Sequence, residues 1–148
     1  MLLLVSPMSR CSNVSLFADL PVGATVLDLG CGSGTDTLIA AGKVGPTGKA
    51  IGVDFSTAML SRSRQAIAES GVANVEIRES DAERLPIGDG EIDVAIVNGI
   101  FNLNPARDAI FRELARVVRP AGTVYAAELI LSQPLPPEAR ANESDWFA

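Results

Sequence analysis

Val26-Leu27-Asp28-Leu29-Gly30-Cys31-Gly32-Ser33-Gly34 is the stretch of this sequence that decides the fold. Its first half is a short apolar run, which is typical of a buried strand. Its second half is a glycine-rich turn, in which the backbone can approach a ligand with no Cβ in the way. In open α/β sheets, ligands bind at the carboxyl ends of the strands. The stretch therefore predicts a strand that leads into a ligand-binding turn.

The spacing of the glycines indicates the kind of ligand. Gly30, Gly32 and Gly34 form a Gly-x-Gly-x-Gly pattern, whereas the dinucleotide fingerprint places its third glycine where Thr35 stands here. That third glycine belongs to a site for a pyrophosphate. The pattern thus favours a ligand that lacks a pyrophosphate, and it disfavours a nicotinamide-dependent dehydrogenase.

The rest of the chain alternates between apolar runs and helical patterns. Apolar runs predict strands at 25–29, 50–53, 74–79, 92–97 and 123–131. Helical patterns predict three helices. The first covers 37–41 and is stopped by Gly42 and Gly45. The second is capped by Ser56, has Met59, Leu60 and Ile67 on one face and is ended by Gly71, and the third is opened by Pro105. This order indicates an α/β fold, a doubly wound, Rossmann-like sheet of about five parallel strands with helices on both faces.

Length and composition limit the class of protein. The 148 residues suffice for a single domain over 1–148, with a core at about 20–131 and a Pro-rich tail at 132–148. Apolar residues make up 47%, which disfavours disorder, and the net charge of −6 disfavours binding to nucleic acid. No apolar run approaches the ~20 residues of a membrane span, and no export signal is evident. We expect a cytoplasmic protein.

The chain has two cysteines, Cys11 and Cys31, and no histidine. Without an export signal the cysteines are expected to be free thiols. The absence of histidine removes the most common general base, and we expect no metal site and no catalytic acid or base.

Acidic residues follow three successive predicted strands. Asp28 lies in the first, Asp54 ends the second, and Asp81 lies in an acidic turn after the third. A carboxylate at the position of Asp54 can accept hydrogen bonds from ribose hydroxyls, although it can equally serve as a helix-start carboxylate. An acidic turn at Asp81 can accept from an adenine amine, or it can be an ordinary solvated loop. Together the three acids favour a ligand site.

Four segments carry a resemblance to a known family. They are VLDLGCGSG at 26–34, GVDFS at 52–56, DAERLP at 81–86 and ELARVVRPAG at 113–122. In this order and spacing they resemble the motifs of class I S-adenosylmethionine-dependent methyltransferases over about residues 20–131. The resemblance implies S-adenosyl-L-methionine as the cofactor and a small-molecule methyl acceptor.

The resemblance also assigns site residues. It implies that the methionine part of the cofactor lies against the glycine turn, with Asp28 near its ammonium and Asn98 near its methionine end, and that Asp54 holds the ribose. The cofactor-binding residues implied are Asp28, Gly30, Cys31, Gly32, Gly34, Asp54, Phe55, Met59, Asp81, Ala82 and Asn98. Phe55 and Met59 would flank the adenine, and Asp81 and Ala82 would contact its edge.

Within that superfamily the chain is most similar to arsenite methyltransferases, through residues 98–105, 43–48 and 134–138. Cys11 matches a family cysteine of a thiolate set that binds arsenic(III), a soft centre that prefers several thiolates. Arg10 and Ser12 replace the glycines that flank this cysteine in the family. The family's further cysteines and the last two, antiparallel strands of its sheet are missing, so we expect a truncated chain or a homodimer through the exposed sheet edge.

Methyl transfer is an in-line displacement for which proximity, alignment and exclusion of water matter most. Two alternatives remain beside arsenite methylation. One is a C-methyltransferase of the quinone-biosynthesis type, which shares the glycine turn and the GVDFS-like segment. The other is a domain that binds the cofactor without turnover.

Overall fold

The computed structural model describes residues 13–102 and 104–128, and it contains one parallel sheet. The strand order is β3-β2-β1-β4-β5, and every neighbouring pair is parallel. The strands are β1 (Thr25–Leu29), β2 (Lys49–Asp54), β3 (Val75–Glu79), β4 (Ile92–Asn98) and β5 (Val118–Ala127). The crossover from β3 back to β4 beside β1 makes the sheet doubly wound, which confirms the predicted α/β fold.

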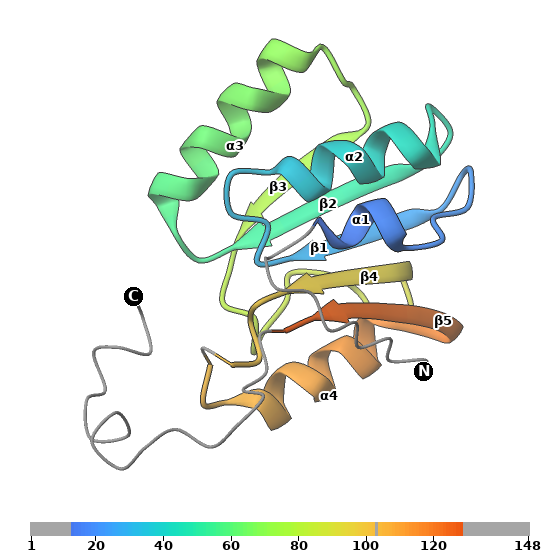
Figure 1. The fold of residues 1–148 in the computed structure, drawn as a ribbon. Coiled ribbons are helices and arrows are strands. Elements are labelled where there is room, and N and C mark those ends of the chain that lie inside the picture. Colours follow the sequence, from blue (N-terminus) through green and yellow to red (C-terminus); the bar gives the residue numbers. More distant parts are fainter. Residues whose placement is uncertain (1–12, 103, 129–148) are drawn as a thin grey trace.

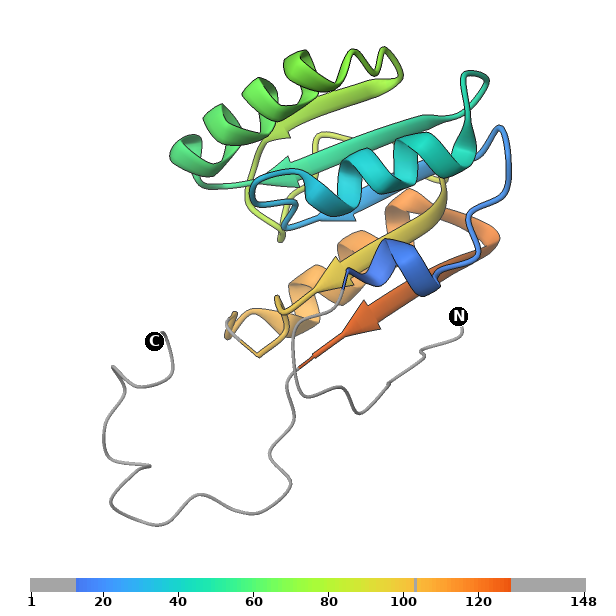
Figure 2. The ribbon, with the colours of Figure 1, turned by 45° about the horizontal axis from the view of Figure 1, so that its top comes forward.

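Helices cover both faces of this sheet (Figure 1). The helices are α1 (Val14–Phe17), α2 (Thr35–Val44), α3 (Thr57–Ser70) and α4 (Arg107–Val117). Figure 2 shows α1 and α2 on one face and α4 on the other, while α3 packs along β2 and β3. Among the described residues, no helix combines the length and the apolar character needed to cross a membrane.

The core consists of two layers, one on each face of the sheet. Side chains of β1 alternate between them: Leu27 and Leu29 pack with Leu114 of α4, whereas Val26 packs with Ala40 of α2. This alternation follows from the two-residue period of a strand. It also directs Asp28 to the α2 face, the same side as Val26.

Local signals set the ends of α3 as predicted. The Ser56 hydroxyl accepts from the Met59 N–H at 3.4 Å, and Gly71 follows the helix with a φ of 69°. The predicted apolar face was wrong in one respect, because Met59 is 40% exposed whereas Leu60 is buried. The buried face of α3 instead joins Leu60 to Ser63.

Two boundaries of other helices also differ from the prediction. Gly42 lies inside α2, which ends only at Gly45. Pro105 does not open α4: the helix begins at Arg107, because the Asn104 carboxamide oxygen accepts from the Ala106 N–H at 2.7 Å and holds the preceding residues in a turn.

The last strand begins earlier than predicted and contains an irregularity. It starts at Val118, directly after α4, and the Pro-Ala-Gly segment lies within it. The register jumps from Ile92↔Val118 to Val94↔Thr123, and Ala121 takes a φ of 65°. This is a bulge, which allows proline and glycine within a strand. The predicted strand residues 129–131 lie outside the described residues.

Candidate functional site

A cavity of about 630 Å³ opens at the carboxyl ends of the strands. Its walls come from the segments that follow β1, β2, β3 and β4. The lining residues are Leu29, Gly30, Val53, Asp54, Phe55, Ser80, Asp81, Ala82, Glu83, Asn98, Gly99, Ile100, Asn104, Pro105 and Ala106. Cavities that bind small molecules have volumes of about 300–1,000 Å³. The cavity lies where an open α/β sheet is expected to bind its ligand.

The structure brings about half of the expected site residues into this wall. Those that line it are Gly30, Asp54, Phe55, Asp81, Ala82 and Asn98. The wall does not include Asp28, Cys31, Gly32, Gly34 or Met59. Cys11 lies outside the described residues.

Asp54 organises the glycine turn as well as facing the cavity. Its Oδ2 accepts from the Gly32 N–H at 2.9 Å, and its Oδ1 accepts from the Ser56 N–H at 2.8 Å. Each carboxylate oxygen can accept more than one hydrogen bond. Asp54 therefore acts on the turn while it keeps acceptor capacity for hydroxyl groups in the cavity.

One glycine in the turn after β1 has free space beside its backbone. The Gly30 and Cys31 N–H groups donate to the Val53 carbonyl at 2.8 and 3.0 Å, which fixes the start of the turn. Gly32 has a φ of +51°, and a Cβ built there would meet nothing within 4 Å. Free space therefore lies beside the Gly32 backbone.

Gly34 has a different role, because it faces α3. A Cβ at Gly34 would lie 2.4 Å from the Ser63 Oγ and 3.2 Å from the Ser63 Cβ. Ser63 is fully buried, and its hydroxyl has no hydrogen-bond partner among the described residues. The missing side chain at Gly34 thus allows α3 to pack against the turn.

Asp28 is buried on the α2 face, with 2% of its surface exposed. The Thr37 hydroxyl donates to its Oδ2 at 2.5 Å. Burial raises the pKa of Asp28 to about 7, and the nearby carboxylates of Asp36 and Asp54 add to this effect. A cation such as an ammonium group near Asp28 would favour its charged form.

Cys31 is a buried free thiol. A Cβ at Gly52 of β2 would lie 3.0 Å from its sulfur, so the side chain packs against that strand. Burial and the neighbouring Asp28 raise the pKa of Cys31 to about 12. Since the thiolate is the form that binds metals or attacks, the raised pKa disfavours a nucleophilic or metal-binding role of Cys31 at neutral pH.

Sequence reasoning missed Asp36, a buried carboxylate at the start of α2. Its Oδ1 accepts from the Ser15 N–H at 3.0 Å and also from the Ser15 hydroxyl. Its Oδ2 accepts from the Asn98 amide at 3.4 Å. Asp36 therefore ties α1 to the end of β4 beside the cavity. No motif distinguishes it, because the signal is the pairing of residues far apart in the chain.

The wall opposite the glycine turn is also held by side chains. Asn104 donates to the Glu83 Oε1 at 2.7 Å, and the Ser80 hydroxyl donates to the Arg84 carbonyl at 2.6 Å. Glu83 and Asn104 were not expected as site residues. Their hydrogen bond joins the segment after β3 to the segment after β4.

The chemistry of the cavity fits S-adenosylmethionine. Asp54 and Asp81 supply acceptors at the ends of two neighbouring strands, as a ribose and an adenine amine require. The backbone at Gly32, in the turn after β1, has open space beside it. The buried acid Asp28 lies within the same segment, where an ammonium would be favourable.

Comparisons with known proteins agree with this geometry. Residues 21–147 match the family described as the methyltransferase domain. The chain is similar to an arsenite methyltransferase of Halobacterium salinarum, 38% identical over 132 residues, which cover 89% of this chain and 34% of the relative. It is also similar to a demethylmenaquinone methyltransferase of Bacillus cereus, 38% identical over 78% of this chain and 48% of the relative.

The fold is similar to that of a solved arsenic(III) S-adenosylmethionine methyltransferase from Chlamydomonas reinhardtii. The TM-score is 0.74 and the identity 30%, over 83% of this chain and 44% of the other. The chain spans about a third of the length of the arsenite methyltransferase relative and about half that of the demethylmenaquinone methyltransferase.

Proposed function

This chain belongs to the methyltransferase domain family, and on that premise we propose that it is the S-adenosylmethionine-binding part of an enzyme that methylates a small-molecule acceptor, arsenite. The cavity at the carboxyl ends of the strands is the observation that carries the proposal. The acceptor is proposed from the likeness to proteins named arsenite methyltransferases.

Each part of the cofactor has proposed partners in this chain. Asp54 binds the ribose hydroxyls, and Asp81 with Ala82 binds the adenine edge. Phe55 is 75% exposed at the cavity and covers the adenine, with Met59 beside it. The residues proposed to hold the methionine part are Asp28, Gly30, Cys31, Gly32 and Asn98. Gly34 acts through its packing against α3.

The bound cofactor supplies an activated methyl group on a sulfonium, so the chain's residues have mainly to align the acceptor and exclude water. Asp36 contributes by tying Ser15 of α1 to Asn98 at the cavity wall. We propose Cys11 as this chain's ligand for the acceptor. Cys11 would then supply one thiolate to arsenic(III).

One thiolate does not satisfy arsenic(III), which prefers several. We therefore propose that these 148 residues bind the cofactor and that arsenite methylation needs further thiolates. The favoured alternative acceptor is a quinone precursor, because the relatives include demethylmenaquinone methyltransferases at 38% identity.

The acceptor is tested by incubating the chain with S-adenosylmethionine and either arsenite with glutathione or demethylmenaquinone, followed by mass spectrometry of the products. The Cys11→Ser variant is the matched control. Arsenite turnover that survives this change would refute the role of Cys11. Methylated quinone without methylated arsenic would favour the alternative acceptor.

We also propose the class of acceptor and the assembly of the protein. The net charge of −6 supports a small-molecule acceptor and disfavours nucleic acid. Since β5 is an edge of the described sheet, we propose that a homodimer forms through that edge. We also propose that the protein acts in the cytoplasm.

A further inference from the structure

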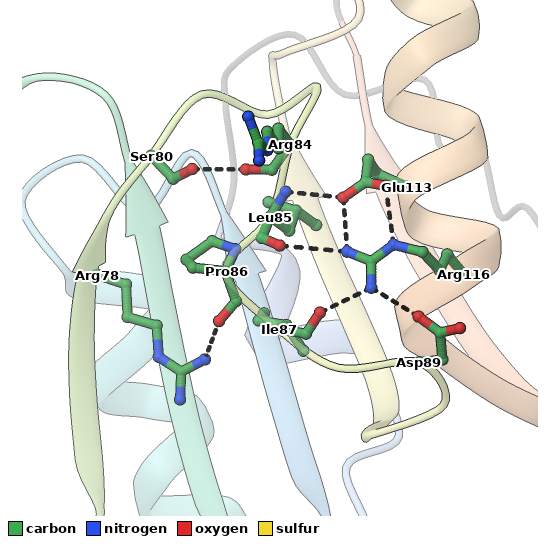
Figure 3. A network of polar contacts seen from close by, with 9 residues as sticks. All are labelled: Arg78, Ser80, Arg84, Leu85, Pro86, Ile87, Asp89, Glu113 and Arg116. Carbon is green, nitrogen blue, oxygen red and sulfur yellow. Dashed lines mark hydrogen bonds and ion pairs between the residues drawn. The ribbon is translucent and has the colours of Figure 1, made fainter.

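The motif at 113–122 has no residue in the cavity wall, yet it contains the most extensively bonded arginine of the described residues (Figure 3). Arg116 of α4 forms a two-pronged ion pair with Glu113. Its Nε donates to the Glu113 Oε1 at 2.9 Å, and its Nη2 donates to Oε2 at 2.7 Å. The guanidinium is planar, so a paired carboxylate fixes its orientation.

With its orientation fixed, Arg116 binds the backbone of the segment after β3. Its Nη1 donates to the Ile87 carbonyl at 2.8 Å, and its Nη2 donates to the Leu85 carbonyl at 3.2 Å. The Glu113 Oε2 in turn accepts from the Leu85 N–H at 2.7 Å. The two side chains therefore satisfy backbone groups of a segment that has no helix or strand of its own. We call Glu113 and Arg116 the clasp.

The clasped segment, residues 85–87, is joined directly to the cavity wall. Leu85 follows the lining residues 80–83 by two positions, and its side chain is buried in the core. The Ser80 hydroxyl and the Arg84 carbonyl close the same short loop by a hydrogen bond. Fixing the backbone at Leu85 and Ile87 thus limits where Asp81 and its neighbours can lie.

The clasp also stays charged over a wide pH range. Its hydrogen bonds with Arg116 lower the pKa of Glu113 to about 2. Neither side chain reaches the cavity, so any effect on a ligand passes through the segment that they hold.

We propose that Glu113 and Arg116 are positioning residues that preorganise the cavity wall at 80–83 and thereby set the affinity for the cofactor. The inference rests on the proposed function. A ligand that binds a wall already in place does not have to order it. If the wall is loosened, the apparent affinity falls in proportion to the fraction of time that the wall is correctly placed.

Arg116→Lys is the principal test, because it keeps the charge and removes the fork that holds both the carboxylate and the backbone. Arg119→Lys is the matched control. Arg119 also donates its Nε to a carboxylate, that of Asp93, at 2.5 Å, but it does not line the cavity or contact the clasped segment. Glu113→Gln is the milder second variant, since it keeps an oxygen that can accept from the Leu85 N–H.

Two measurements on the full chain decide the outcome: calorimetric affinity for S-adenosylhomocysteine, and hydrogen exchange of the amides at 80–88. We expect Arg116→Lys to weaken binding about fivefold or more, with faster exchange confined to 80–88, and Arg119→Lys to leave both unchanged. Glu113→Gln should shift both in the same direction by less.

The clasp would serve stability alone if three results were found together. The melting temperature would fall equally in the two lysine variants, the affinity would stay within twofold of that of the parent chain, and hydrogen exchange at 80–88 would be unchanged. Failure of the parent chain to bind S-adenosylhomocysteine would instead overturn the proposed function. In that case, unaltered exchange at 80–88 in Arg116→Lys would overturn the positioning role as well.

Discussion

Alanine at two glycines of the same turn should have opposite consequences, one for stability and one for binding. Gly34→Ala forces a side chain into a φ of +87° and places its Cβ 2.4 Å from the Ser63 Oγ. The left-handed conformation costs about 1–2 kcal/mol. The Oγ of the fully buried Ser63 would have to move away from the new Cβ, so we add about 1 kcal/mol for overpacking. The sum is a loss of about 2–3 kcal/mol.

Gly32→Ala provides the comparison. Its φ of +51° carries the left-handed cost, but no atom lies within 4 Å of the added Cβ. We expect a loss of stability of only about 1 kcal/mol. The new methyl group would occupy space proposed for the cofactor, so affinity for S-adenosylhomocysteine should fall more than in Gly34→Ala.

Urea denaturation followed by circular dichroism gives the stabilities, and calorimetry gives the affinities. The double variant Gly34→Ala/Ser63→Ala should recover about 1 kcal/mol of the loss at Gly34, since the buried hydroxyl that lies against the new Cβ is gone. Equal stability of Gly34→Ala and Gly32→Ala, or no recovery in the double variant, would refute the assignment of Gly34 to packing.

Three further predictions concern single residues of the site. Asp54→Ala should weaken S-adenosylhomocysteine binding strongly, because hydrogen bonds to a charged acceptor contribute about 1.5–3 kcal/mol each; a loss below about threefold in calorimetry contradicts the ribose assignment. The raised pKa of Asp28, about 7 against 3.8, means that the folded chain binds more protons between these values. The free energy of unfolding should therefore fall by up to about 4 kcal/mol as the pH rises from about 4 to 7, and denaturation of Asp28→Asn should lack this slope. Cys31, with a pKa of about 12, should resist iodoacetamide at pH 7.5 in a Cys11→Ser background until urea unfolds the chain; rapid labelling of the folded protein counts against its burial.

The sequence predicted the parts of this fold that local pattern controls. The buried strands β1 and β4 are mostly apolar, and Ser56 and Gly71 mark the ends of α3. The parallel order follows from the alternation of strands and helices. Asp54 could be placed at the cavity because it ends a strand whose neighbours were also recognised.

The parts that could not be predicted depend on contacts between distant residues. Helix α1 has four residues, and Ser15 holds it to Asp36 across 21 positions of the chain. The start of α4 depends on the Asn104 side chain, and the bulge in β5 depends on its register with β4. The packing of Gly34 against Ser63 of α3 could not be predicted either, because the spacing of the glycines carries no information on the facing helix.

We propose that the cavity binds S-adenosylmethionine through the turn at 30–34 and the acids Asp54 and Asp81. Calorimetric titration of the chain with S-adenosylhomocysteine and, in parallel, with NAD tests it most directly. We expect binding of S-adenosylhomocysteine and weaker or undetectable binding of NAD, because the turn lacks the glycine that a pyrophosphate requires. Tighter binding of NAD than of S-adenosylhomocysteine would contradict it.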